Sequence, residues 1–436
     1  GASLSGITFI SVPGDVGSTS LTYFQVVLGY LFGYFVVAFV LLPIYYKQNL
    51  TSIYEYLGDR FGRKSHMTGA FFFFVSRVLG AAFRLFLVAI VLQQFVFDSW
   101  GVPFEFTVTI SILLIWIYTF RGGIKTVVWT DTLQTLLMIL SVFLSIYYIT
   151  MSLDIGFIEF LNSEDFNTKS EIFVTDSILE KNHFLKSFIG GIFITICMTG
   201  LDQDMMQKNL TCRTLGDAQK NMIVFSIILV AVTFIFLILG TLLFTFAEKN
   251  DVFIPILNGR ESTDLLFPQI ALNSDLNIML SITFLLGLIA AAYSSADSAL
   301  TSLTTSFCID FMDIENKDEK SQKKLRFYTH ILMSIFLIVV ILVYKNYLST
   351  SVIDSLLTIA GFTYGPLLGL FAFGIFTKFK INDNLSFFVC LISVLIVSYI
   401  FFRPELLGGY KIGYELLPIN GLITFFGLYI IRKSTT

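Results

Sequence analysis

The chain has 436 residues, 55% of them hydrophobic and only 14% charged, and its mean hydropathy is +0.80. A soluble fold of this length needs a much larger polar surface, so the composition excludes a soluble globular protein and indicates a polytopic membrane protein. A lipid bilayer is expected around the chain because of this composition. The formal net charge of −3 says nothing about partners, and no basic patch indicates a nucleic-acid partner. The four cysteines form neither a secreted disulfide framework nor a CxxC metal motif.

Apolar segments long enough to cross a hydrocarbon core of about 30 Å recur along the chain. Together with an opening half-helix they make about twelve membrane elements, all helical. The predicted spans cover residues 20–46, 67–97, 104–120, 124–151, 187–207, 218–247, 277–308, 327–346, 352–376, 384–402 and 417–431.

Glycine and proline interrupt the opening of the chain at Gly6 and at Pro13–Gly14. Residues 1–6 are too short and too rich in small side chains to span a bilayer alone, so we expect the chain to begin in the middle of a helix. Short, glycine-interrupted apolar pieces are typical of the discontinuous helices of secondary transporters, although an ordinary truncated helix end fits this segment as well. We expect a partner half-helix between Gly190 and Gly200.

Two arginines, Arg77 and Arg84, lie within a single predicted span and seven residues apart, so they face nearly the same direction. Arginines at membrane depth are rare and are functional by default. Two roles are open for them. Either arginine could clamp an anionic group of a substrate, or it could pair with Asp131 or Asp297.

Acidic and amide side chains mark two further spans. Asp131 lies about one and a half turns into its helix, too deep for a simple N-cap. Four polar residues close the 187–207 span, and for these we expect capping and gate hydrogen bonds: Asp202, Gln203, Asp204 and Gln207.

Small and hydroxyl side chains line one face of the long apolar segment near residue 295. Ala291, Ser294, Ser295 and Ser298 stand at i, i+3, i+4 and i+7, and Asp297 lies beside them. Close helix packing is one explanation, because small residues let membrane helices approach. A carboxylate at the membrane centre costs about 3 kcal/mol unless it is partnered, which favours an ion site. Hydroxyl, carbonyl and carboxylate oxygens suit a small hard cation, so the sequence predicts cation-linked transport.

Most of the 28 lysines and arginines gather in loops on one side of the predicted membrane, including residues 47–66 and 309–326. The positive-inside rule places these loops and the C-terminus in the cytoplasm. The acidic loop 152–186 and the loop 248–276 then lie outside, and the second is long enough to form a cap. The sequence contains no GxxxxGK[ST] phosphate loop and no catalytic cluster, so neither ATP-driven pumping nor an enzyme is expected.

Four motifs carry a resemblance to a known family. They are TSIYEYLGDRFG (residues 51–62), TFRGGIKTVVWTD (119–131), GLDQDMMQK (200–208) and Ala-x-x-Ser-Ser (291–295). In sequence and order they resemble the sodium:solute symporter family, which includes sodium/sugar, sodium/proline and sodium/sialic acid symporters. The resemblance implies an all-α, LeuT-like fold with broken first and sixth helices. It would comprise inverted five-helix repeats at 1–151 and 187–377, an external loop at 152–186 and further helices at 378–436.

The resemblance also implies binding sites. By the family pattern, one sodium site uses backbone carbonyls and serine hydroxyls of five residues: Gly1, Leu4, Ala291, Ser294 and Ser295. Some members have a second sodium site, and its matching positions here are Asp131, Ser294, Asp297 and Ser298. Family substrate contacts match Ser5 and Thr8, and with a looser placement Gln25 and Arg84.

Two departures from the family pattern bear on function. Asp297 stands where a serine or another small residue is usual, and it could strengthen a second cation site, bind a proton or pair with Arg84. The leading helix and the first half of the broken helix are expected to be missing. The implied function is sodium-coupled import of a small polar solute, such as a sugar, a sialic acid or another carboxylate, by a monomer in the plasma membrane. A proton-coupled symporter, a channel and a transport-inactive solute sensor are the alternatives.

Overall fold

The computed structural model describes residues 5–48, 52–121, 124–312, 314–347 and 351–433, with the backbone only at 118–121, 124–130, 315 and 347. Apart from one two-stranded hairpin, the secondary structure of the described residues is helical. Eight described helices are long and apolar enough to cross a membrane, and a bent pair makes a ninth. The predicted class, an all-helical polytopic membrane protein, is confirmed.

The helices follow the predicted spans closely. In chain order they are α1 (Gly6–Thr19), α2 (Tyr23–Val36) with η1 (Val37–Leu41) and α3 (Leu42–Gln48), α4 (Glu55–Phe61), α5 (Arg63–Leu92) with η2 (Gln93–Phe97) and η3 (Asp98–Trp100), α6 (Phe104–Arg121), α7 (Ile124–Ser152), α8 (Phe157–Leu161), α9 (Glu164–Asn167), α10 (Phe184–Thr195) with η4 (Ile196–Gly200), and α11 (Gln203–Leu210). The second half comprises α12 (Leu215–Lys249), β1 (Ile256–Leu257), β2 (Arg260–Glu261), η5 (Thr263–Leu265), α13 (Leu266–Asn273), α14 (Ile278–Ser306) with η6 (Phe307–Phe311), η7 (Ile314–Asn316), α15 (Glu319–Tyr347), α16 (Val352–Phe376), η8 (Asp383–Leu385), α17 (Ser386–Phe401), η9 (Pro404–Leu407) and α18 (Leu416–Ile430).

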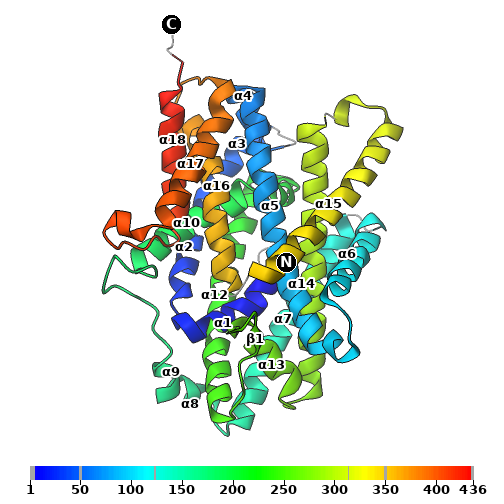
Figure 1. Cartoon of the computed structure of the whole chain (residues 1–436), viewed down its shortest axis with the longest axis vertical. Helices are drawn as coiled ribbons and strands as arrows, with labels where there is room; N and C mark the ends of the chain where they lie inside the picture. The colour runs from blue at the N-terminus through cyan, green and yellow to red at the C-terminus, as the bar shows by residue number, and fades with distance from the viewer. Residues whose placement is uncertain (1–4, 49–51, 122–123, 313, 348–350, 434–436) are drawn as a thin grey trace.

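The helices form a bundle, which Figure 1 shows with its longest axis vertical. We call the end where α18 finishes and α4 lies the C-terminal face, and the end that carries α8, α9 and α13 the opposite face. The first described helix, α1, begins near the middle of the bundle's height and runs toward the opposite face (Figure 1). This is the position expected of a half-helix in a broken span.

The second break lies between α10 and α11. Here α10 with η4 and α11 are bent by 66°, at Leu201–Asp202. The Asp202 side chain caps the new helix by accepting a hydrogen bond from the backbone N–H of Met205 at 3.2 Å. This break confirms the broken sixth helix that the family resemblance implies, although the first half runs from Phe184 to Gly200 and is longer than the expected half-helix between Gly190 and Gly200.

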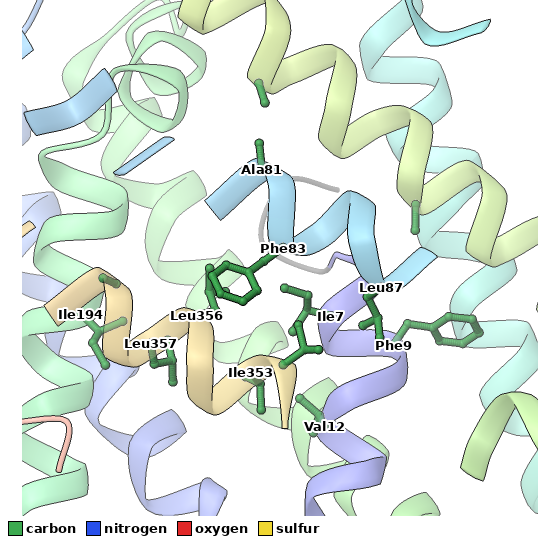
Figure 2. Packing of buried hydrophobic residues seen from close by; sticks show 14 of the residues in the cluster. Ile7, Phe9, Val12, Ala81, Phe83, Leu87, Ile194, Ile353, Leu356 and Leu357 are labelled. Atoms are coloured by element: carbon green, nitrogen blue, oxygen red, sulfur yellow. The ribbon is translucent and has the colours of Figure 1, made fainter. Parts of the chain in front are cut away.

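Packing around α1 explains how so short a helix is held. Figure 2 shows side chains of α1, α5 and α16 pointing toward one another, among them Ile7, Phe83 and Leu356. Phe9 stacks on Phe284 of α14 with ring centroids 5.1 Å apart. Lipid tails are as apolar as these side chains, so helices in a bilayer associate through close van der Waals contact. The position of α1 therefore depends on its fit against α5, α14 and α16.

The structure corrects one expectation about α1. The helix runs unbroken from Gly6 to Thr19, so the expected interruption at Pro13–Gly14 is wrong. A proline inside a membrane helix is tolerated where neighbouring groups satisfy the freed carbonyl. Gly14 instead allows a close approach, because a Cβ at this position would lie 2.7 Å from the Thr263 carbonyl oxygen.

Glycines also set the crossing of α2 and α10. A Cβ on Gly191 would lie 2.2 Å from the Val26 carbonyl oxygen, and one on Gly29 would lie 2.2 Å from that of Phe188. Both obstacles are backbone atoms within helices, so they cannot rotate away. The two helices therefore approach as closely as they do because these positions have no side chain.

Replacing Gly191 with alanine is expected to destabilise the protein by about 2–3 kcal/mol, because α2 and α10 must move apart. The measurement is the apparent melting temperature in detergent, which should fall by several degrees. Gly216→Ala at the exposed start of α12, where the nearest atom is 3.9 Å away, is the matched control and should leave it unchanged. Equal melting temperatures for the two variants would contradict the role given to Gly191.

Candidate functional site

A cavity of about 120 Å³ lies at the centre of the bundle, between α1, α2, α5, α10, α12 and α16. Four of the predicted substrate contacts line it: Ser5, Thr8, Arg77 and Arg84. Three tyrosines of α2 also line it and were not among the predicted contacts: Tyr23, Tyr30 and Tyr34. Their spacing of seven and four residues places them on one face of an apolar helix, which is a signal that could have found them.

Gln25 does not line this cavity. Its side chain is fully buried and donates hydrogen bonds to the backbone carbonyls of Thr22 and Asn182, both at 3.1 Å. Its carbonyl oxygen accepts one from the N–H of Val174 at 3.1 Å. Gln25 therefore holds the loop after α9 against α2 through hydrogen bonds. We do not include it in the solute site proposed below.

Arg77 is paired, but with carboxylates other than those expected. Its guanidinium lies 2.5 Å from Asp204 and 3.8 Å from Asp202, and the Tyr364 hydroxyl donates to Asp202 at 2.7 Å. Of the two roles left open for Arg77, a structural pairing is thus the one observed, but with Asp204 and Asp202 in place of Asp131 or Asp297. The bend before α11 turns the first residues of that helix toward α5, which brings these two carboxylates within reach of the arginine.

The hydrogen bonds and ion pairs around Arg77 extend to α14. Ser298 donates to the Asp204 carboxylate at 2.8 Å, and the Lys208 ammonium donates to the Ser298 hydroxyl at 2.5 Å. Arg77 lies seven residues before Arg84, about 10 Å nearer the C-terminal face. The network of Arg77, Asp202, Asp204, Ser298 and Lys208, which we call the inner network, therefore ties α5, α11 and α14 together on the side of the cavity toward that face.

Arg84 differs from Arg77 in having no counter-charge among the described residues. It is half-buried on the cavity wall, forms no ion pair with the part of the chain that the structure describes, and its Nε has no hydrogen-bond partner there. A guanidinium enclosed in protein is costly unless a negative group meets it. The arrangement leaves one positive charge directed at whatever occupies the cavity.

The predicted sodium ligands on α14 lie against the first turn of α1. A Cβ on Gly6 would be 3.9 Å from the Ala291 Cβ. The Ser295 hydroxyl is buried and has no hydrogen-bond partner in the described part of the chain. An unsatisfied oxygen in a membrane interior fits a cation ligand, because leaving it unpaired costs free energy. The other predicted ligands, Gly1 and Leu4, fall outside the described residues.

The four positions predicted for a second sodium site are only partly brought together. Ser294 donates a hydrogen bond to Asp131, across from α14 to α7. Asp297 is buried and accepts from Thr301 at 3.3 Å. Ser298 is engaged by Asp204 and Lys208 in the inner network. Asp131 and Ser294 are thus a contacting pair, whereas the Ser298 hydroxyl is held elsewhere.

On the other side of the cavity, the loop between α12 and α14 closes over α1. Asp264 of η5 is buried, and its carboxylate accepts a hydrogen bond from the Val352 N–H at the start of α16, at 2.9 Å. Thr263 lies against Gly14 of α1. The expected cap therefore exists, and it joins the ends of α1 and α16.

This cap is expected to be sensitive to pH. Burial raises the pKa of Asp264 from 3.8 to about 6, although the Val352 N–H opposes the shift. The folded protein then binds this proton more tightly than the unfolded chain, so stability falls as pH rises from about 4 to about 6 and stays low above that. Melting temperatures measured from pH 4 to 7.5 should show this fall, and Asp264→Asn should make it smaller. The exposed Asp275→Asn is the control, and an unchanged slope in Asp264→Asn would refute the assignment.

Comparison with known proteins gives a consistent result. The model of the sodium:solute symporter family matches residues 1–392. The sodium/sialic acid symporter NanT of Aliivibrio fischeri is 27% identical over 414 residues, which cover 91% of this chain and 77% of that protein. The sodium-coupled monocarboxylate transporter 2 of Danio rerio is 26% identical over 406 residues, covering 88% and 63%.

The fold is also that of a solved structure. A substrate-bound, outward-open Na⁺-coupled sialic acid symporter superposes with a TM-score of 0.79 and 23% identity, covering 99% of this chain and 89% of the other. At this level of identity the match concerns the fold alone. It confirms the predicted LeuT-like architecture.

Proposed function

The chain belongs to the sodium:solute symporter family, and we propose that the solute it imports with sodium is a small organic carboxylate. As a member of that family it is a transporter and not an enzyme. The observation that carries the proposal is Arg84, whose charge faces the cavity without an ion pair in the described part of the chain. Guanidinium and carboxylate match in a two-bond geometry that a neutral sugar cannot reproduce. Sialic acid and monocarboxylates, named in the two relatives above, both carry this group.

The solute would lie between α1, α5 and the tyrosines of α2. Ser5 and Thr8 on α1 supply hydroxyls for its polar groups, and Arg84 on α5 receives the carboxylate. Arg77 also lines the cavity, but its charge is already balanced by Asp204. We therefore assign solute contact to Arg84 and a structural role to Arg77.

Sodium would bind where α1 begins. The carbonyls of Gly1, Leu4 and Ala291 and the hydroxyls of Ser294 and Ser295 form the ligand set, supported by the unpaired Ser295 hydroxyl. Sodium held there would fix the start of α1, and with it Ser5 and Thr8, in the geometry that binds solute. For a second cation we propose the Asp131–Ser294 pair with Asp297 nearby, which could hold sodium or a proton.

Transport would follow alternating access between two inverted repeats, at 1–151 and 187–377. We place the C-terminal face in the cytoplasm, because most lysines and arginines lie in the loops of that face. The inner network then closes the cytoplasmic exit, and the Asp264 cap covers the outer side. Loss of sodium inward would free the start of α1 and allow the exit to open. The family's usual site is the plasma membrane.

The proposal can be tested in two steps. A thermal-shift screen of sugars, amino acids, sialic acids and short monocarboxylates, with and without sodium, should find a carboxylate that stabilises the protein only with sodium. Liposomes containing the protein should then accumulate that solute when sodium is applied outside. Uptake driven by a pH gradient alone would indicate proton coupling, passive equilibration a channel, and binding without uptake a sensor.

A further inference from the structure

A second cavity, of about 330 Å³, lies outside the proposed solute site. It is enclosed by the outer end of α5 with η2, by α6, and by α14, with one residue of α15. Its wall is almost wholly apolar, and Leu85, Val88, Ile112 and Ile341 are typical members. A cavity of about 150 Å³ with such a lining stays dry and binds benzene. This larger one has room for a longer hydrocarbon, and its few polar side chains include Thr107 and Ser111, whose hydroxyls already donate to Gln93 and to the Thr107 carbonyl.

The cavity reaches the lipid-facing surface of the bundle. Its α6 wall includes Phe106, Ile110 and Leu114, whose side chains are 54%, 37% and 46% exposed. Figure 1 shows α6 at the edge of the bundle, away from α16 and α18. At the depth of a membrane-spanning helix the surrounding medium is acyl chain, not water. Hydrocarbon from the bilayer is thus the material that meets this opening.

One end of the cavity has the features of a membrane–water interface. Trp100 lines it and is 72% exposed, as is usual for tryptophan at the level of lipid head groups. Beside it, at the start of α6, Glu105 pairs with Lys345 at 3.0 Å. The other end lies near the membrane centre, at Ala292 and Tyr293 of α14. The cavity is therefore oriented like a lipid tail, with its polar end at the interface and its apolar end inside.

We propose that this cavity is a binding slot for one acyl chain of a bilayer phospholipid, with the head group beside Trp100 and Lys345. The slot shares walls with the proposed sodium site. Val88 lines the slot, and its Cγ2 lies 3.1 Å from the position of a Cβ on Gly6 at the start of α1. Ala292 follows the sodium ligand Ala291 directly. A bound chain would hold Val88 against α1 and so favour the sodium-binding geometry.

The slot itself is tested by photolabelling. The protein is placed in nanodiscs with a phospholipid that carries a diazirine at the end of one acyl chain, and labelled peptides are identified by mass spectrometry. The label is expected on the 289–293 segment of α14 and on the facing part of α6. Ser111→Trp, which fills the slot from α6, should reduce α14 labelling at least tenfold, whereas Leu113→Trp on the lipid-facing side of the same helix should not. Label spread evenly over lipid-facing helices, or equal labelling in both variants, would overturn the slot.

The coupling to sodium rests on the proposed function and has its own readout. The sodium concentration that half-saturates the thermal shift is measured in detergent, with and without added phospholipid. In the unmodified protein, phospholipid should lower this concentration several-fold, while Ser111→Trp should show the lower value with or without lipid. Specific labelling together with a sodium requirement that lipid does not change would overturn the coupling and leave the slot standing. A protein that sodium does not stabilise in any condition contradicts the proposed function instead.

Discussion

Replacing Ser294 and Ser295 together with alanine is expected to abolish sodium-dependent uptake. The double variant removes both hydroxyl ligands proposed for the cation, and only backbone carbonyls would remain. Removing groups that merely orient metal ligands already costs about 10–100-fold in metal affinity, so loss of two direct ligands should cost at least about 100-fold. Sodium-driven uptake into liposomes and the sodium concentration for half-maximal thermal stabilisation both measure this loss.

The matched control lies on the same helix. Ser302 is buried on α14, two turns beyond Ser294, and its hydroxyl donates to the Ala299 carbonyl at 3.1 Å. Ser302→Ala removes a buried hydroxyl of the same kind without touching the proposed site, so it should transport normally. The single Ser295→Ala variant then separates the two serines, because Ser294 also donates to Asp131. Full sodium dependence in the double variant would refute the site.

The membrane spans could be predicted because the signal is local. A run of apolar residues is by itself evidence of a membrane environment, and each predicted span overlaps a helix or a series of consecutive helices. The break near Gly200 was also readable, since glycine followed by Asp202 is a helix end followed by an N-cap. The same logic failed at Pro13, because neighbouring elements decide whether a proline breaks a membrane helix.

Contacts between distant segments could not be predicted in the same way. Four carboxylates, Asp131, Asp202, Asp204 and Asp297, lie at or near membrane depth, and nothing local says which of them reaches Arg77. The choice is made by the 66° bend before α11, a helix that packs against α12 and α14. Gln25 illustrates the same limit. From the sequence, an amide in an apolar helix can either contact the solute or hold a loop in place. The position of residues 174–182 decides between these two roles, and only the structure gives that position.

The two arginines of α5 should respond to the same substitution in opposite ways. Arg77→Gln leaves Asp204 and Asp202 buried without their main counter-charge, with Lys208 3.8 Å from Asp204 as partial compensation. Breaking a buried pair from one side costs about 3–5 kcal/mol. We expect a melting temperature at least several degrees lower. A double variant, Arg77→Gln with Asp204→Asn, should recover part of it, because no uncompensated carboxylate of Asp204 then remains.

Arg84→Gln removes a charge that no described residue balances, so the fold should be as stable as before or slightly more so. Binding of the carboxylate solute should instead weaken by about 100-fold or more, since one side of a buried charge-assisted pair is lost. The measurements are melting temperature and sodium-dependent solute binding on both variants. Sodium stabilisation without solute should survive in Arg84→Gln, because its ligands on α14 are intact. The opposite outcome would be a melting temperature of Arg84→Gln as low as that of Arg77→Gln, with normal solute binding once Arg84→Gln is combined with a stabilising substitution elsewhere. Arg84 would then be a structural residue, and the solute need not be an anion.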